Sequence, residues 1–124
     1  MSQPGDPIEG DVLVHVAAKA SVPPRRLTPL IDTVQEEIAA ESDSLCRRYE
    51  TAYEAETGKG RTVALFVDRG FWDRMGDRLG LTDREIDAVR RAHHEQLRAE
   101  GKRRDRLDEF ETALEIRDCV VLNA

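Results

Sequence analysis

Long apolar runs, aromatic residues and cysteines are all scarce in this chain of 124 residues. No stretch approaches the ~18 consecutive apolar residues of a membrane span. The start of the chain, Met1–Asp11, lacks the basic-then-apolar order of a signal peptide. We therefore expect a cytoplasmic protein that does not bind membranes. Aromatic residues make up only 5% of the chain, so its core must consist mainly of Leu, Val, Ile and Ala.

Cysteine occurs only at Cys46 and Cys119, which form no C-x-x-C pair. Both lie among apolar neighbours, which favours small buried hydrophobic residues over a redox or metal role. Lysine is also scarce, whereas charge in general is abundant: 35% of the residues are charged and the net charge is −6. Acid excess with few lysines is typical of a salt-loving source, because acid-rich surfaces stay soluble in concentrated salt.

The spacing of apolar residues predicts a single helical domain over residues 11–124, preceded by a flexible tail over residues 1–10. A helix is expected over residues 12–20, although the β-branched residues of 12–16 leave a strand as the alternative. The prolines of Ser21–Pro24 must interrupt it. Thr28 and Pro29, a capping hydroxyl followed by proline, predict the start of a long helix over residues 29–57, which Gly58 ends.

Two short runs, residues 62–67 and 119–122, are apolar on both alternating faces and are predicted to be buried strands. They are expected to pair with each other, in a direction that the sequence leaves open. Three helical stretches separate them, and Thr82 with Glu85 three positions later forms a capping box at the start of the second. The predicted class is α+β, predominantly helical, with about five helices and a small two-stranded sheet.

An apolar face extends along the predicted 29–57 helix, in a chain with few other elements to cover it. Uncovered apolar surface of this kind is typical of protein interfaces. We therefore expect a non-enzymatic interaction or regulatory protein that binds a partner protein or a second copy of itself, as a homodimer. The candidate self-association face consists of Leu30, Ile31, Val34, Ile38, Leu45, Tyr49 and Tyr53.

No catalytic, cofactor-binding or metal-binding residue is predicted. His93 and His94 are adjacent, so on a helix they point about 100° apart, whereas two metal ligands need positions three or four apart. We expect His93 at the edge of the core and His94 on the exposed flank. Serine, cysteine and histidine fall into no nucleophile signature. An enzyme would require His94 or His15 to meet carboxylates from another helix in a pocket.

Residues 71–91 carry the most specific local pattern. A helix-turn-helix has a small residue in its first helix, a glycine four positions later, and apolar anchors further on. The four matching residues are Gly76, Gly80, Ile86 and Val89. The stretch therefore resembles the helix-turn-helix of DNA-binding regulators, and such a regulator is the alternative function.

Charge opposes this alternative. The groove-facing positions of the second helix would be Thr82, Asp83, Arg84, Asp87 and Ala88. Its two aspartates would repel DNA phosphates, since binding requires the release of counterions by cations. A nucleic-acid contact would be more favourable through the following cations: Lys102, Arg103, Arg104 and Arg106.

Three segments also resemble a family of small uncharacterised proteins of haloarchaea. They are Val22-Pro23-Pro24 before a helix, Leu79-Gly80-Leu81 before residues 87–93, and residues 109–117. This resemblance covers most of the chain. It implies a salt-loving source but no activity and no site residues.

Overall fold

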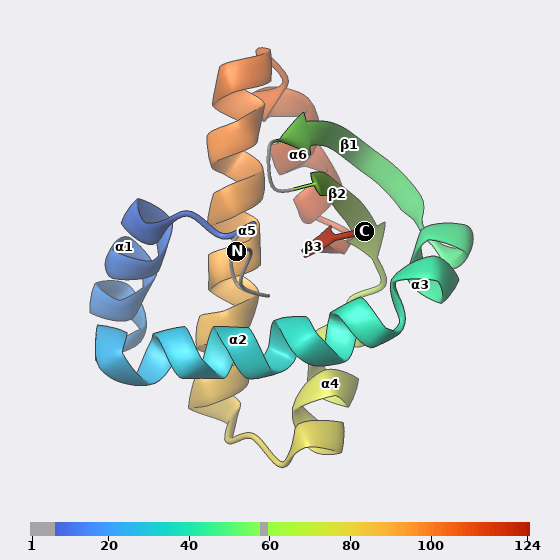
Figure 1. The fold of residues 1–124 in the computed structure, drawn as a ribbon. Helices are drawn as coiled ribbons and strands as arrows, with labels where there is room; N and C mark the ends of the chain where they lie inside the picture. Colours follow the sequence, from blue (N-terminus) through green and yellow to red (C-terminus); the bar gives the residue numbers. More distant parts are fainter. Residues whose placement is uncertain (1–6, 58–59) are drawn as a thin grey trace.

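The computed structural model describes residues 7–57 and 60–124. Over these residues the chain forms six helices and one sheet of three strands (Figure 1). The elements are, in chain order, α1 (Gly10–Ala20), α2 (Pro24–Ala40), α3 (Ser42–Arg48), β1 (Glu50–Thr57), β2 (Gly60–Val67), α4 (Phe71–Leu79), α5 (Asp83–Arg104), α6 (Leu107–Leu114) and β3 (Asp118–Asn123). The predominantly helical α+β class is confirmed, with one helix and one strand more than predicted.

The sheet is antiparallel throughout, with the strand order β1-β2-β3. The predicted strands over residues 62–67 and 119–122 lie within β2 and β3 and do pair, with Ala64 opposite Val121 and Phe66 opposite Cys119. Strand β1 pairs with the other side of β2, so β2 is the central strand. The sheet therefore has two edges, one at β1 and one at β3.

The prediction of one helix over residues 29–57 is wrong. The helix begins five residues earlier, at the Pro23-Pro24 pair, and Pro29 lies inside it. It ends at Ala40, a short α3 follows, and residues 50–57 form strand β1. Glu41 separates the two helices with a non-helical φ of −113°. Gly58, the predicted end of the long helix, lies outside the described residues.

The N-terminal segment is helical, as the 12–20 prediction requires, and the strand alternative for residues 12–16 is wrong. Of the predicted tail, residues 1–6 lie outside the described residues, and α1 already begins at Gly10. Ile8 is buried in the core. The backbone N–H of Glu9 donates to Gln96 of α5 at 2.8 Å. Residues 7–9 are therefore packed against the domain.

The long helix α5 is at the centre of the fold and contacts α1, α2, α4, α6 and β3 (Figure 1). Helix α2 crosses it and turns its apolar face onto α5 and β3. The predicted self-association face is therefore used inside the monomer. Ile31, Val34, Ile38, Leu45 and Tyr53 are buried, and Leu30 and Tyr49 are partly buried against the same core.

Helices α4 and α5 follow each other across a short connection, residues 80–82, and pack against each other. Gly80 ends α4 in the left-handed conformation at φ 68°, which favours glycine. Thr82 and Glu85 form the predicted capping box at the start of α5. Gly76 lies against Ile86, where an added Cβ would come within 3.1 Å of that side chain. This glycine therefore allows the two helices to pack closely.

Candidate functional site

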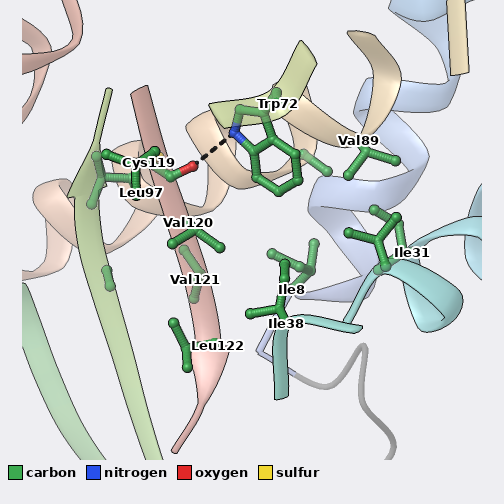
Figure 2. Close-up of a cluster of buried hydrophobic side chains, with 14 of the residues drawn as sticks. Ile8, Ile31, Ile38, Trp72, Val89, Leu97, Cys119, Val120, Val121 and Leu122 are labelled. Atoms are coloured by element: carbon green, nitrogen blue, oxygen red, sulfur yellow. Dashed lines mark hydrogen bonds between the residues drawn. The ribbon is translucent and has the colours of Figure 1, made fainter. Parts of the chain in front are cut away.

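The outer edge of β3 is closed by side chains from three helices. The backbone N–H of Val121 donates to Nδ1 of His93 in α5 at 2.8 Å. The carbonyl of the same residue accepts from Nε2 of Gln35 in α2 at 2.8 Å. Two residues earlier, the carbonyl of Cys119 accepts from Nε1 of Trp72 in α4 at 3.0 Å (Figure 2). No further strand can be added here without displacing these buried side chains.

The electrostatics of this closed edge require a neutral histidine. His93 is fully buried and packs on the ring of Trp72 with centroids 4.6 Å apart. Burial, and then the neighbouring His94, lower the pKa of His93 to about 3. Because Nδ1 accepts a hydrogen bond, the neutral ring carries its proton on Nε2. Burial likewise raises the pKa of the Cys119 thiol, which makes it an unreactive core residue.

Asp118 fixes the start of β3 to α5. Its carboxylate is 2% exposed and accepts from Nε of Arg90 at 2.9 Å and from Nε2 of His94. Burial raises the pKa of Asp118, but the hydrogen bonds from His94 and Arg90 outweigh it, so the net shift is downward. The carboxylate is therefore ionised at neutral pH.

Two places among the described residues bear on the expected enzyme: this cluster, and a hollow lined by His15 of α1 and Glu95 of α5. His94 does meet a carboxylate, although from a strand and not from another helix, and it lies mostly buried. Among residues 7–57 and 60–124, no hydroxyl or thiol hydrogen-bonds to His94. The same residues hold no group of three or more His, Cys, Asp or Glu side chains that could bind a metal ion. The geometry is that of a tether between α5 and β3.

Among the described residues, no strand pairs with the outer edge of β1, and its backbone is not closed by buried side chains as that of β3 is. The backbone N–H and C=O of Val121 point away from β2 and bond to helix side chains. In an antiparallel pair the residue opposite then also points its backbone groups away, so the N–H and C=O of Ala64 point to β1. By the same alternation, Tyr53 bonds to Ala64, and the backbone groups of Glu54 and Glu56 point outward. One of these groups is occupied: the carbonyl of Glu54 accepts from Arg104 at 3.2 Å.

Charged side chains and an irregularity surround this edge. Glu54 pairs with Arg61 of β2 at 2.9 Å, and Glu50 pairs with Arg117 at 2.9 Å. The register shifts between Thr51 and Tyr53, which is a β-bulge or a similar irregularity. Such features are the usual means by which exposed edges avoid pairing with copies of themselves.

The four predicted nucleic-acid contacts lie near this end of the molecule, at the end of α5 and just beyond it. Arg103 pairs with Glu9 and with Glu100, the latter at 2.7 Å. Arg104 pairs with Glu100 and lies over the ring of Tyr53, 4.6 Å from its centroid.

The other two of these cations, Arg106 and Lys102, differ in whether they have an acidic partner. Arg106 pairs with Glu109 at 2.6 Å and lies over the ring of Phe110, 4.7 Å from its centroid. Lys102 is exposed and has no acidic partner within the part of the chain that the structure describes. Three of the four cations are therefore neutralised by neighbouring acids, and they form no continuous positive ridge.

The start of α5 also departs from the predicted recognition helix. Ala88, one of the positions expected to face a DNA groove, is completely buried in the core. Asp87 pairs with Arg91 at 2.8 Å, one turn later. This face is thus partly used for packing and partly neutralised by its own ion pairs.

Neither edge of the sheet was predicted from the sequence. The residues that close β3 come from positions 35, 72 and 93, and no local pattern connects them. Strand β1 had a signal, the apolar–polar alternation over residues 53–56, but the longer helical spacing concealed it.

The chain is thus a predominantly helical α+β domain with a small antiparallel sheet, and the two edges of this sheet differ. The chain belongs to a family defined by a domain of unknown function (DUF8048), whose model matches residues 6–124. No curated protein and no solved structure matches the chain. Among the described helices, none has the length and apolar character needed to cross a membrane.

Proposed function

We propose that this protein is a non-enzymatic interaction protein that binds an extended, basic segment of a partner protein along the free edge of β1. The observation that supports this proposal is that the outward backbone groups are hydrogen-bonded differently at the two edges of the described sheet. At β3 the outward backbone groups are hydrogen-bonded by Gln35, Trp72 and His93, whereas at β1 those of Glu54 and Glu56 face outward. An added strand gains main-chain hydrogen bonds only where such groups are accessible.

Charge favours a basic partner over a second copy of this chain. In a two-fold antiparallel pairing centred on Ala55, Glu54 of one copy would lie opposite Glu56 of the other. Like charges directly opposite each other on neighbouring strands are destabilising. The net charge of −6 opposes self-association in the same way and attracts a basic segment.

Composition supports two further parts of the proposal, the salt-loving source and the cytoplasmic location. The acid excess and the scarcity of lysine favour a salt-loving source, in whose cytoplasm the protein would act. Main-chain hydrogen bonds persist in concentrated salt, whereas charge attraction is screened within about 3 Å at 1 M. Binding should therefore be measured at both low and molar salt.

A proline substitution at the edge tests the proposal. The N–H of Glu54 points away from β2, so Glu54→Pro removes no hydrogen bond of the existing sheet, while it deletes one donor that an added strand needs. Glu54→Ala is the matched control, because it loses the same ion pair with Arg61 but keeps the N–H. Circular dichroism checks that both variants fold.

The probe is a peptide of alternating lysine and valine, titrated while the amide resonances of the protein are followed by NMR. We expect the amide resonance of Glu56, which all three proteins retain, to shift in the wild type and in Glu54→Ala, but not in Glu54→Pro. A peptide of alternating glutamate and valine should leave them unchanged. The proposal fails if the basic peptide moves no β1 resonance, or if light scattering shows dimers that Glu54→Pro dissociates.

A further inference from the structure

A second candidate site lies at the opposite end of α5 from the open edge of the sheet. Where the α1–α2 turn meets the start of α5, a hollow of about 370 Å³ opens to the surface. Its polar lining comes from Ser21, Arg26, Thr82, Arg84 and Glu85. Ligand pockets of proteins begin at about this size.

Arg84 is the unusual residue of this hollow. The other arginines of α5 all have a carboxylate partner within 4 Å: Arg90, Arg91, Arg98, Arg103 and Arg104. Arg84 has none among the residues that the structure describes. In a chain with more acids than bases, a guanidinium left without an acid beside a hollow is available to an anion from solution.

A second guanidinium faces the same hollow and is only weakly engaged. Nη2 of Arg26 lies 3.5 Å from Oε2 of Glu85, and the Arg26 side chain is 66% exposed. Such an exposed pair contributes about 1 kcal/mol or less. Glu85 is also occupied elsewhere, since its other oxygen accepts from the N–H of Thr82 at 2.9 Å. Arg26 can therefore turn from Glu85 to a more strongly charged ligand at little cost.

The remaining lining indicates the shape of the ligand. Oγ1 of Thr82 accepts from the N–H of Glu85 at 3.1 Å, so its own hydrogen is available to donate. Ser21 adds a second exposed hydroxyl. On the inner wall, Val22 and Leu30 present an apolar surface. The hollow thus combines cationic and hydroxyl donors with an apolar wall.

We propose that this hollow binds a small phosphomonoester, with its phosphate between Arg26 and Arg84 and its apolar body against Val22 and Leu30. Guanidinium groups bind phosphate oxygens through paired, charge-assisted hydrogen bonds, and the two hydroxyls can donate to the same oxygens. The carboxylate of Glu85 sets the limit of the site, because a ligand must displace it from Arg26. This inference is independent of the β1 edge.

Phenyl phosphate is a suitable probe, because it joins a phosphate to an apolar ring, and its binding can be followed by NMR titration. We expect saturable shifts of residues around the hollow. Arg84→Gln and Arg26→Gln should each weaken binding about tenfold or more, as expected for the loss of charge-assisted hydrogen bonds. Arg91→Gln is the matched control: it removes the same charge from α5 but lies outside the hollow, so affinity should stay unchanged.

Two comparisons make the outcome decisive. Inorganic phosphate should bind more weakly than phenyl phosphate, and phenol should not bind. Equal affinities for the two phosphates would overturn the role of the apolar wall. The absence of saturable shifts, or an equal loss of affinity in Arg84→Gln and Arg91→Gln, would overturn the site itself.

Discussion

His93 makes the stability of this protein depend on pH already between pH 7 and pH 5, above most of the titration of ordinary carboxylates. In the folded chain the pKa of His93 is about 3, against an ordinary value of 6.5, because the ring is buried. Between these two values the unfolded chain binds more protons than the folded chain. The free energy of unfolding must therefore fall as the pH falls through this window.

The size of the effect follows from the two pKa values. From pH 7 to pH 5, the single site costs about 2 kcal/mol of folding stability. This interval lies wholly above the folded-state pKa of about 3, so its cost depends mainly on the unfolded-state value. The lowered pKa of Asp118 adds a further loss at more acidic pH, which begins as the pH falls through the ordinary carboxyl pKa of 3.8.

His93→Asn isolates this contribution. The asparagine carbonyl can accept from the N–H of Val121 as Nδ1 of His93 does, but the side chain has no titrating group. The variant loses ring packing against Trp72 and should be less stable than the wild type at pH 7. Its stability should nevertheless depend less on pH, by about 2 kcal/mol between pH 7 and pH 5.

Urea unfolding followed by circular dichroism at several pH values measures the difference. Val89→Ala is the control, because it removes fully buried methyl groups but keeps His93, and it should retain the pH dependence of the wild type. Equal pH dependence in His93→Asn and in the wild type would refute the reasoning. The imidazole would then be as free to protonate in the folded chain as in the unfolded one.

Two further predictions concern packing. Gly101→Ala should lower the free energy of unfolding by about 1–3 kcal/mol, because the added Cβ would come within 3.0 Å of Cδ2 of Phe110 and of the following backbone. Gly10→Ala, with nothing within 4 Å, should be close to neutral in the same urea titration. Trp72→Phe should cost about 1–3 kcal/mol, since the buried carbonyl of Cys119 loses its donor. Unfolding followed by circular dichroism checks this value. An unchanged stability in Gly101→Ala or in Trp72→Phe would contradict the packing described.

Local signals in the sequence predicted the parts of the fold that depend on neighbouring residues. The capping box of Thr82 and Glu85, the helix stop at Gly80 and the apolar runs of β2 and β3 each carry their information within a few positions. These features form as the sequence predicts, because a cap or a glycine stop is favourable whatever surrounds it.

Strand β1 was missed because its spacing fits two structures. Leu45, Tyr49 and Tyr53 are four residues apart, and residues four apart share a face both on a helix and on a strand. In the structure Leu45 belongs to α3 and Tyr53 to β1, and both face the core. Only the partner strand β2 decides between the two, since a strand needs a neighbour to bond its backbone.

The proposed binding edge could not be predicted for a similar reason. Whether an edge is open depends on what lies beside it in space, and the groups that close β3 come from three separate helices. The cations were visible in the sequence, but their partners were not. The ion pair between Arg103 and Glu9, for example, joins residues that are 94 positions apart in the sequence.

The two edges differ because they have different access to water. The edge of β3 is inside the core, where an unpaired N–H or C=O would cost several kcal/mol, of order 2–7, so buried polar side chains must take the place of a neighbouring strand. The edge of β1 can bond to solvent and needs no such side chains, and its glutamates oppose pairing with a second copy. In the function proposed above, the same glutamates would also attract a basic segment. Protection against self-pairing and choice of partner would then have one physical origin, the acidic residues Glu54 and Glu56 on either side of Ala55.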